Sequence, residues 1–401
     1  MTSLAAMIPN WPLVIVVEAT VIAVYCSYLP YCHVLFCELR NYVMVKYLNS
    51  ELIMIKNLNM KPTGWFHVGW SAEIVPGGVK PMKYFDQDLV ATRTSKGELS
   101  IFDAHCPHMG AHLGYGGKMK DDCLTCPYHG WRFDIGGSNV LIPYEEGHTI
   151  NKKLKKWHTV EQHEMIFLWH DPTGGAPREG WLPHLFDHDE RPADINDFYP
   201  AYSNGAIVYK PGERIHPQMV VENAADSSHF KYTHGAPEDP KNLYFDNSGP
   251  IWKSSMGFLS PKTKEVALTT YARNPGIGLS FFIFHHHGSD RNGGTAYQGF
   301  NRRLVLSATP VDNETTDLRV TYFFPKDPAS PDVMPQHVKD AAAHTEDLFE
   351  EDAIIWRHQK FIQRPLFSKL DLEIYTALRK WSSQFYEVEG LPVGPLLVAE
   401  R

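Results

Sequence analysis

The sequence predicts an α+β protein with an apolar N-terminal segment, an all-β domain and a larger mixed domain. Two observations separate the domains. Short strand-like runs with Gly-containing turns occupy residues 60–172 and indicate an all-β domain. The Pro- and Gly-rich stretch Pro172–Pro177 indicates an interdomain linker, and further strand-like runs and helical segments follow it. We therefore expect an N-terminal segment over residues 1–40 and domains over 60–172 and 178–401.

Length, charge and cysteine usage narrow the class of protein. A chain of 401 residues can form two domains with ample core, and 43% hydrophobic and 21% charged residues are ordinary for a globular protein. The net charge of −8 argues against nucleic acid as a partner. The 6 cysteines form no disulfide framework, which suits a reducing compartment.

The N-terminal segment is predicted to be a membrane helix. Leu13–Leu29 is almost wholly apolar and would span about 25 Å as a helix, the lower limit for a bilayer. No Lys or Arg precedes it, so a signal peptide with a charged n-region fits poorly. Because Arg40, Lys46 and Lys56 follow it, we expect the rest of the chain on the cytoplasmic side. A buried helix or interfacial anchor is the alternative, which Glu18 favours.

Residues 65–71 are expected to open the first domain, and strands are expected at 89–93, 99–102 and 165–169. Between them lie the strings Cys106-Pro-His108 and Cys126-Pro-Tyr-His129, each of which offers one thiolate and one imidazole. This is the ligand set of a Rieske [2Fe–2S] cluster. A zinc site is the alternative, but zinc sites usually place two Cys in one half and two His in the other.

A second metal site is predicted in the second domain, where strands are expected at 279–284, 304–307 and 318–323. His229 and His234 are five apart, and could project to one side of an irregular helix. Two His with one carboxylate hold non-haem Fe(II) and leave positions open for O₂ and substrate. The pair alone is weak evidence in a chain with 21 His, but Asp226, one helical turn before His229, strengthens it.

The carboxylate ligand is predicted on a helix over residues 338–359. We expect Asp352 in the middle of its apolar arc, which is formed by Leu348, Phe349, Ile355 and Trp356. A lone carboxylate on a buried face is costly unless it is paired or binds metal, so a buried salt bridge is the alternative. A solvated role is expected for the other carboxylates of this helix, Glu346, Asp347, Glu350 and Glu351.

These strings, with Glu-Asn-x-x-Asp-x-x-His-x₄-His from Glu222 and Glu-Asp-x-x-Ile-Trp from Glu351, resemble the α-subunits of Rieske non-haem iron oxygenases. The chain is most similar to the steroid branch, which includes the Neverland-type cholesterol 7-desaturases and the oxygenase subunits of 3-ketosteroid 9α-hydroxylases. The resemblance covers roughly residues 60–390. It implies a helix-grip (START-like) catalytic domain with the iron at the mouth of its sheet.

The resemblance also implies a role for each matched residue. Cys106 and Cys126 would hold one cluster iron, and His108 and His129 the other. The mononuclear Fe(II) ligands would be His229, His234 and Asp352. Asp226 would bridge an iron-ligand His to a cluster His across the subunit interface of a homotrimer. Asn223 would lie near the iron.

The function implied is that of a sterol oxygenase or desaturase that uses O₂. Electrons would come from NAD(P)H through a separate reductase, because no Gly-x-Gly-x-x-Gly follows a strand. We expect a cholesterol 7-desaturase of steroid hormone biosynthesis, held in the endoplasmic reticulum membrane and forming 7-dehydrocholesterol. The alternatives are a steroid hydroxylase of the 3-ketosteroid 9α type, a chlorophyll-breakdown oxygenase, and an electron-transfer Rieske protein, which needs no second iron.

Overall fold

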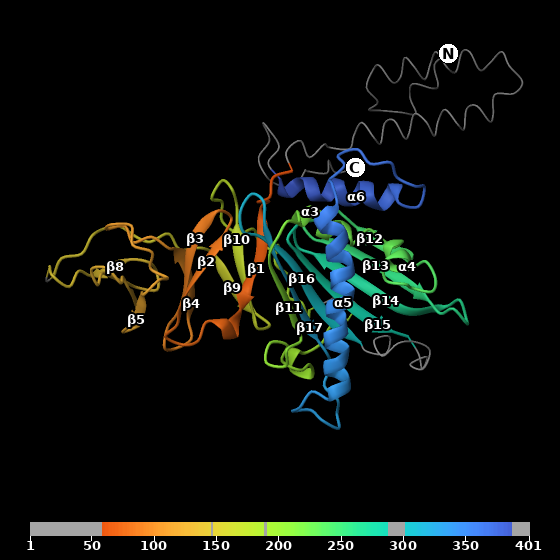
Figure 1. The fold of residues 1–401 in the computed structure, drawn as a ribbon, viewed down its shortest axis with the longest axis horizontal. Coiled ribbons are helices and arrows are strands. Elements are labelled where there is room, and N and C mark those ends of the chain that lie inside the picture. Colours follow the sequence, from red (N-terminus) through yellow and green to blue (C-terminus); the bar gives the residue numbers. More distant parts are fainter. Residues whose placement is uncertain (1–57, 146, 188–190, 288–300, 387–401) are drawn as a thin grey trace, which may run out of the picture. The chain divides into compact units, whose positions relative to one another are not determined.

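The computed structural model describes residues 58–145, 147–187, 191–287 and 301–386. All of them fall in one unit, Met54–Arg401, which is an α+β fold dominated by antiparallel sheets (Figure 1). The predicted membrane segment, residues 1–40, lies outside the described residues. Among those that are described, no helix has the length and apolarity needed to cross a membrane.

The first domain consists of three small sheets, with strand orders β1-β10-β9, β2-β3-β4 and β5-β6-β7-β8. The expected strands at 89–93, 99–102 and 165–169 correspond to β3, β4 and β10, and residues 65–71, expected to open the domain, largely form β1. Its elements are β1 (Gly64–Trp70), the 3₁₀-helix η1 (Ser71–Glu73), β2 (Val79–Tyr84), β3 (Gln87–Arg93), β4 (Leu99–Asp103), β5 (Lys118–Lys120), β6 (Cys123–Thr125), β7 (Arg132–Phe133), β8 (Asn139–Leu141), β9 (Thr159–Gln162) and β10 (Met165–His170).

The second domain is built on one seven-stranded antiparallel sheet of order β11-β17-β16-β15-β14-β13-β12. Its strands are β11 (Ile207–Glu213), β12 (Lys241–Asp246), β13 (Trp252–Leu259), β14 (Val266–Asn274), β15 (Leu279–His286), β16 (Arg302–Pro310) and β17 (Thr316–Phe323). The helical elements are η2 (Ile195–Asp197), α3 (Pro217–Glu222), α4 (His229–Tyr232), α5 (Gln336–His358), α6 (Leu372–Ser382) and η3 (Ser383–Phe385). The long helix α5 lies across the sheet (Figure 1), as expected of a helix-grip domain.

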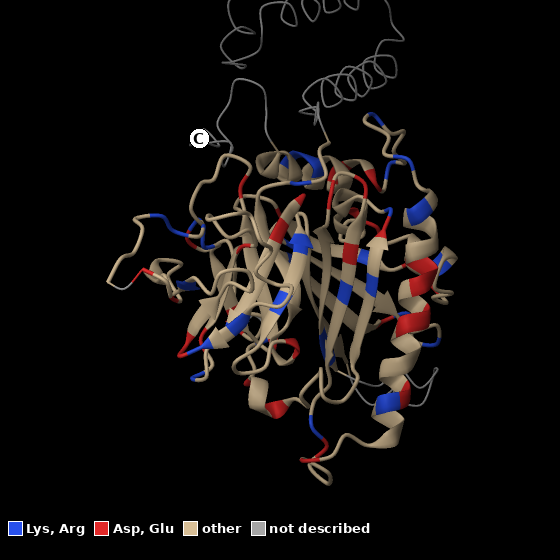
Figure 2. Cartoon of the chain, turned by 60° about the vertical axis from the view of Figure 1, so that its left-hand side comes forward, with Lys and Arg blue, Asp and Glu red and all other residues tan. Residues whose placement is uncertain are grey.

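Helix α5 begins and ends within two residues of the predicted positions, but its buried face differs from the prediction. Acidic positions gather in the middle of α5, with basic positions toward its ends (Figure 2). Ile355 was expected in the apolar arc, yet it is 47% exposed. Successive residues of a helix are rotated by about 100° around its axis. The buried face of α5 is centred on Phe349, Ala353 and Trp356, and Ile355 therefore points away from this face. Asp352 therefore lies at the edge of the buried face, not in its middle.

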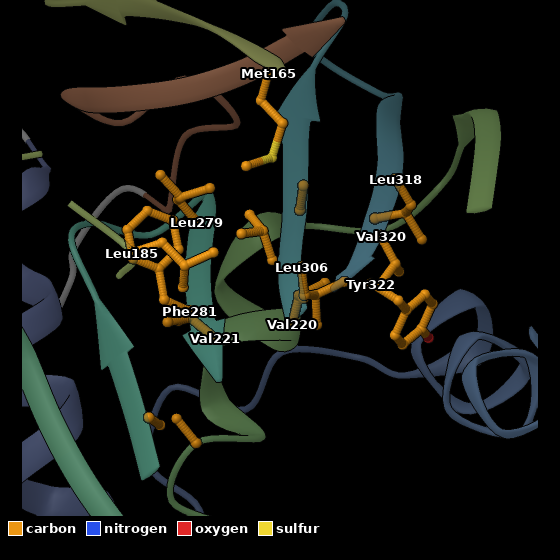
Figure 3. Close-up of a cluster of buried hydrophobic side chains, with 14 of the residues drawn as sticks. Met165, Leu185, Val220, Val221, Leu279, Phe281, Leu306, Leu318, Val320 and Tyr322 are labelled. Atoms are coloured by element: carbon orange, nitrogen blue, oxygen red, sulfur yellow. The ribbon is translucent and has the colours of Figure 1, made fainter. Parts of the chain in front are cut away.

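The largest hydrophobic core joins the two domains. Met165 from β10 lies beside Leu279 and Leu306 of the large sheet, and Val220 and Val221 of α3 pack below them (Figure 3). Because α3 precedes the His229–His234 string, this core fixes the starting point of the predicted iron site.

A buried polar network also connects the domains. The Tyr84 hydroxyl donates to Asp317 Oδ2 (3.1 Å), and the Arg319 guanidinium donates to both Tyr84 (2.7 Å) and Asp317 (3.2 Å). Nearby, the Thr309 hydroxyl donates to the carbonyl of His67 (2.6 Å). Buried charges require such partners, so the network ties β1 and β2 to β16 and β17.

One close contact at this junction depends on a missing side chain. Phe66 of β1 is fully buried against Gly278 of the loop before β15. A Cβ atom at position 278 would lie 2.2 Å from a ring carbon of Phe66 and 2.8 Å from the carbonyl oxygen of Ala308. Only glycine at position 278 leaves room for the ring.

Candidate metal centres and active site

The two Cys–His loops of the first domain have the same backbone arrangement. The Gly110 N–H donates to the Cys106 carbonyl (2.9 Å), and the Gly130 N–H donates to the Cys126 carbonyl (3.1 Å). Both glycines have a left-handed backbone conformation, with φ of 73° and 71°, which residues other than glycine adopt only at an energetic cost. Each loop thus turns back on itself directly after its Cys and His.

These turns bring the four predicted cluster ligands together. The rings of His108 and His129 are 4.6 Å apart between centroids, and both cysteines are buried. Burial raises the pKa of the Cys106 thiol to about 11, with backbone N–H groups opposing and the adjacent Cys126 thiol adding to it. Nδ1 of His108 is buried without a hydrogen-bond partner. Two buried thiols and two converging imidazoles fit a [2Fe–2S] cluster, whose positive irons would stabilise the thiolates.

Trp131 supports this arrangement. Its indole stacks on the His108 ring at 4.5 Å and 7°, and its N–H donates to the Tyr144 hydroxyl (2.8 Å). The sequence offered one signal for it, the Gly-Trp that follows the second loop, but not the stacking partner in the other loop.

The predicted mononuclear ligands also come together. One ligand atom from each of His229, His234 and Asp352 lies within 4.8 Å of the other two. His234 Nε2 is 3.1 Å from Asp352 Oδ1, and both ring nitrogens of His229 are buried without a hydrogen-bond partner. Two imidazoles and one carboxylate that converge in this way fit the facial ligand set of non-haem Fe(II).

The local chain geometry explains how two histidines five apart converge. The His229 N–H, at the first residue of the single-turn helix α4, donates to Asp226 Oδ1 (3.1 Å). The chain then closes on itself, since the Thr233 N–H donates to the His229 carbonyl (2.7 Å) and Gly235 is left-handed at φ 65°. His234 therefore lies just past the helix and faces back toward His229.

Two neighbouring side chains orient these ligands. The Asn223 amide donates to Asp352 Oδ2 (3.3 Å), so the residue expected near the iron contacts the carboxylate ligand. Glu351 lies 2.8 Å from Nδ1 of His234, although a solvated role was expected for it. A carboxylate on Nδ1 directs Nε2 toward a metal. Adjacency to Asp352 was the only signal in the sequence, because the contact depends on the tertiary fold.

Asp226 contacts His229 but no other predicted ligand. Its Oδ1 is 3.6 Å from His229 Nδ1, and its side chain is 31% exposed. Burial opposes ionisation of this carboxyl, but the His229 ring and backbone N–H outweigh burial and lower its pKa. Asp226 is thus a partly exposed anion behind a predicted iron ligand.

The three predicted iron ligands border a cavity of about 610 Å³ between the large sheet, α4 and α5. Most of its wall is apolar and comes from alternate residues of neighbouring strands, including Phe282, Phe284, Leu304, Leu306 and Val320. Arg302 and Tyr322 also contribute to this wall.

Comparisons with known proteins agree with both sites. Residues 64–158 match the Rieske [2Fe-2S] domain, and residues 168–386 match the 3-ketosteroid 9alpha-hydroxylase C-terminal domain. Cholesterol 7-desaturase nvd 1 of Ciona intestinalis is 30% identical over 81% of this chain and 68% of its own. The oxygenase component of 3-ketosteroid-9-alpha-monooxygenase of Rhodococcus rhodochrous is 28% identical over 82% of each chain.

The solved structures are more distant. The structure of NdmA of Pseudomonas putida CBB5 with caffeine aligns with a TM-score of 0.60 and 19% identity over 80% of this chain and 90% of its own, and supports the fold alone.

The two domain matches show that the chain belongs to the Rieske non-haem iron oxygenases. Its catalytic domain is of the 3-ketosteroid 9α-hydroxylase type. This confirms an enzyme with a [2Fe–2S] cluster and a mononuclear iron that receives electrons from NAD(P)H through a separate reductase. The assignment of individual ligand residues stays a prediction.

Proposed function

We propose that this enzyme is a sterol desaturase that converts cholesterol to 7-dehydrocholesterol in steroid hormone biosynthesis, with O₂ and reductase-supplied electrons. The observation that carries the proposal is the apolar cavity at whose border His229, His234 and Asp352 meet. The relatives named for cholesterol and 3-ketosteroids support a steroid as its occupant.

The cavity suits a rigid apolar substrate. Its volume falls within the roughly 300–1,000 Å³ of small-molecule sites. Phenylalanine and leucine side chains from the sheet would remove the sterol rings from water, which contributes about 25 cal/mol for each Å² of apolar surface buried.

The residues at the predicted iron centre have different roles. Fe(II) held by two imidazoles and one carboxylate would supply the activation of O₂ and the removal of hydrogen from an unactivated carbon. His229, His234 and Asp352 would hold it, while Glu351 fixes the His234 ring and Asn223 fixes the carboxylate. The apolar wall excludes water from the reacting carbon.

A homotrimer is part of the proposal. Within the described unit, β5 and β8 of the cluster domain lie on the side of β1–β4 away from α4 and α5 (Figure 1). We infer that the cluster loops serve the iron site of a neighbouring copy. Asp226, a partly exposed anion beside His229, would receive a cluster histidine of that copy.

We also propose that residues 1–40 form a single-pass anchor in the endoplasmic reticulum membrane with the catalytic part cytoplasmic. The apolar run Leu13–Leu29 and the basic residues Arg40, Lys46 and Lys56 support this topology. We further propose that the two domains that follow this anchor occupy residues 60–172 and 178–401.

The direct test uses membranes that contain the full-length protein and a reductase, incubated with cholesterol, NADPH and O₂. Mass spectrometry should detect 7-dehydrocholesterol, and membranes carrying Asp352→Ala should form none. The match of the catalytic domain favours a steroid hydroxylase as the second candidate. That activity would appear as a 3-ketosteroid product with one added oxygen. A protein that only cycles its cluster, with no product from either steroid, would instead be an electron carrier.

A further inference from the structure

The cavity contains a charged side chain that the proposed reaction does not use. Arg302, the first residue of β16, contributes to its wall beside apolar residues. It pairs in register with Phe284, and its guanidinium lies over the Phe284 ring at 4.0 Å from the centroid. Stacking uses the flat face of a guanidinium, whereas its N–H donors point outward from the edges.

The direction of α5 relative to the sheet relates Asp352 to the strands that carry Arg302 and Tyr322. Arg357 near the end of α5 bonds to Glu213, which pairs with Thr316 at the start of β17. Thr345, earlier in α5, accepts a hydrogen bond from Tyr322 near the end of β17 (3.4 Å). Helix α5 therefore runs antiparallel to β17 along the cavity.

Arg302 is separated from the predicted ligands near α4 across the sheet, because β16 lies three strands from β13, whose Phe258 contacts Phe230 beside His229. From Asp352 back to Thr345, α5 advances by about 10 Å, which brings it level with Tyr322. Tyr322 pairs with Leu304, and Arg302 lies two residues further along the same direction, about 7 Å. A cationic donor thus borders an otherwise largely apolar cavity, away from α4 and the two predicted histidine ligands beside it.

We propose that Arg302 is a specificity-determining residue that donates hydrogen bonds to an oxygen acceptor of the sterol, away from the reacting carbon. The inference rests on the proposed function and adds a substrate feature to it. A hydroxyl, ketone or carboxylate oxygen offers the same acceptor chemistry. Burial lowers the pKa of Arg302 to about 10, still well above neutral, so the side chain is a cation when substrate binds.

The test compares ligands that differ in one oxygen function. The iron- and cluster-loaded protein is kept anaerobic, and displacement of a fluorescent sterol gives dissociation constants. One pair is cholesterol and cholest-5-ene, which lacks the 3-hydroxyl. The other pair is 3β-hydroxychol-5-enoic acid and its methyl ester, which differ in charge at the side chain. Wild-type protein should prefer the oxygen-bearing or anionic member of at least one pair by about tenfold.

Two variants of Arg302 and one control variant test whether Arg302 causes that preference. Arg302→Met should abolish it, and Arg302→Lys should retain part of it because the positive charge remains. Arg214→Met is the control, since Arg214 is an exposed cation that pairs with Glu314 and does not line the cavity. It should leave the preference unchanged. In turnover, Arg302→Met should raise KM for the preferred sterol with little change in kcat. The cluster absorbance and the melting temperature verify folding.

The outcomes separate this inference from the proposed function. The inference is overturned if wild-type protein binds all four sterols without preference, or if folded Arg302→Met keeps the preference. The pair that responds identifies which end of the sterol faces Arg302. If wild-type protein binds none of the four, the proposed function fails, and the inference fails with it.

Discussion

Single residues at the predicted iron centre work in pairs in which one side chain fixes another. Glu351 is 2.8 Å from Nδ1 of His234, and the Asn223 amide is 3.3 Å from Asp352. Each contact leaves one ligand atom directed at the common centre. Loss of a supporting residue should therefore weaken metal binding without removing a ligand.

Glu351→Gln tests the supporting contact. The amide lacks the negative charge that favours a metal-bound imidazole, so we expect iron affinity about tenfold lower and an unchanged cluster spectrum. Iron retained after dialysis against a chelator series measures the effect. Glu346→Gln is the control, because Glu346 is more exposed and lies 3.8 Å from Lys210. Equal iron retention in both variants would remove Glu351 from the centre.

Asp352→Ala tests the carboxylate ligand itself. Two histidines hold Fe(II) weakly, so this variant should keep its cluster spectrum, lose most mononuclear iron and show no turnover. Metal analysis and product formation are the measurements. Normal turnover in Asp352→Ala, together with an inactive Glu346→Ala or Glu351→Ala, would show that another carboxylate is the ligand.

Asp226→Asn tests the proposed link between copies. An amide still forms hydrogen bonds, but it does not stabilise a partly cationic imidazole as a carboxylate does. We expect a variant that holds both metals and binds sterol but turns over slowly. Single turnover after chemical reduction measures this directly. Cluster reoxidation at the wild-type rate, with O₂ and sterol present, would mean that Asp226 only starts α4.

At the scale of elements, an ion-pair network holds α5 against β11. Arg357 donates to both oxygens of Glu213 (2.7 and 2.8 Å) and to Glu350, which also accepts from Lys210 (2.8 Å). Hydrogen bonds from Arg357 and Lys210 lower the pKa of Glu350 from 4.5 to about 2. The helix that carries Asp352 is thus fixed at its C-terminal half.

Arg357→Met should make stability less dependent on pH. A carboxyl whose pKa is lowered on folding stabilises above its ordinary pKa of 4.5, and this contribution disappears as pH falls toward 2. At pH 7 we expect a loss of about 1 kcal/mol, because the pairs are partly exposed and water screens them. Urea unfolding at pH 7 and pH 3 gives the free energy of unfolding of both proteins. The difference between variant and wild type should be smaller at pH 3 than at pH 7. Arg214→Met, in a pair that is more than 70% exposed, should change little at either pH.

Local patterns in the sequence predicted much of this architecture. The two Cys–His loops and α5 follow from short-range spacing, since turns and helical periodicity depend on neighbours. Contacts between distant segments did not follow. Glu351 meets His234 across 117 positions, and Ile355 is exposed because the sheet covers a narrower face of α5 than its apolar residues suggest. The order of the seven strands likewise depends on tertiary pairing.

At the scale of the whole molecule, the buried network at the domain junction should make the two domains unfold together. Asp317→Ala would leave Arg319 buried without its carboxylate partner, which typically costs about 3–5 kcal/mol. Urea unfolding followed by cluster absorbance and by tryptophan fluorescence should shift equally to lower concentration. Glu314→Ala, at an exposed position on the neighbouring turn, should leave both curves in place. Separate shifts of the two signals would contradict a shared transition.

The contact between Phe66 and Gly278 also limits how such enzymes can recombine. A cluster domain without an aromatic ring at position 66 would leave a void over Gly278, and a catalytic domain with any larger residue at 278 would exclude Phe66. Two domains joined by a linker such as Pro172–Pro177 are therefore not freely interchangeable between such enzymes. Chimeras of related oxygenases should fold well only when both halves of this contact come from the same parent, so these two positions would be inherited as a pair.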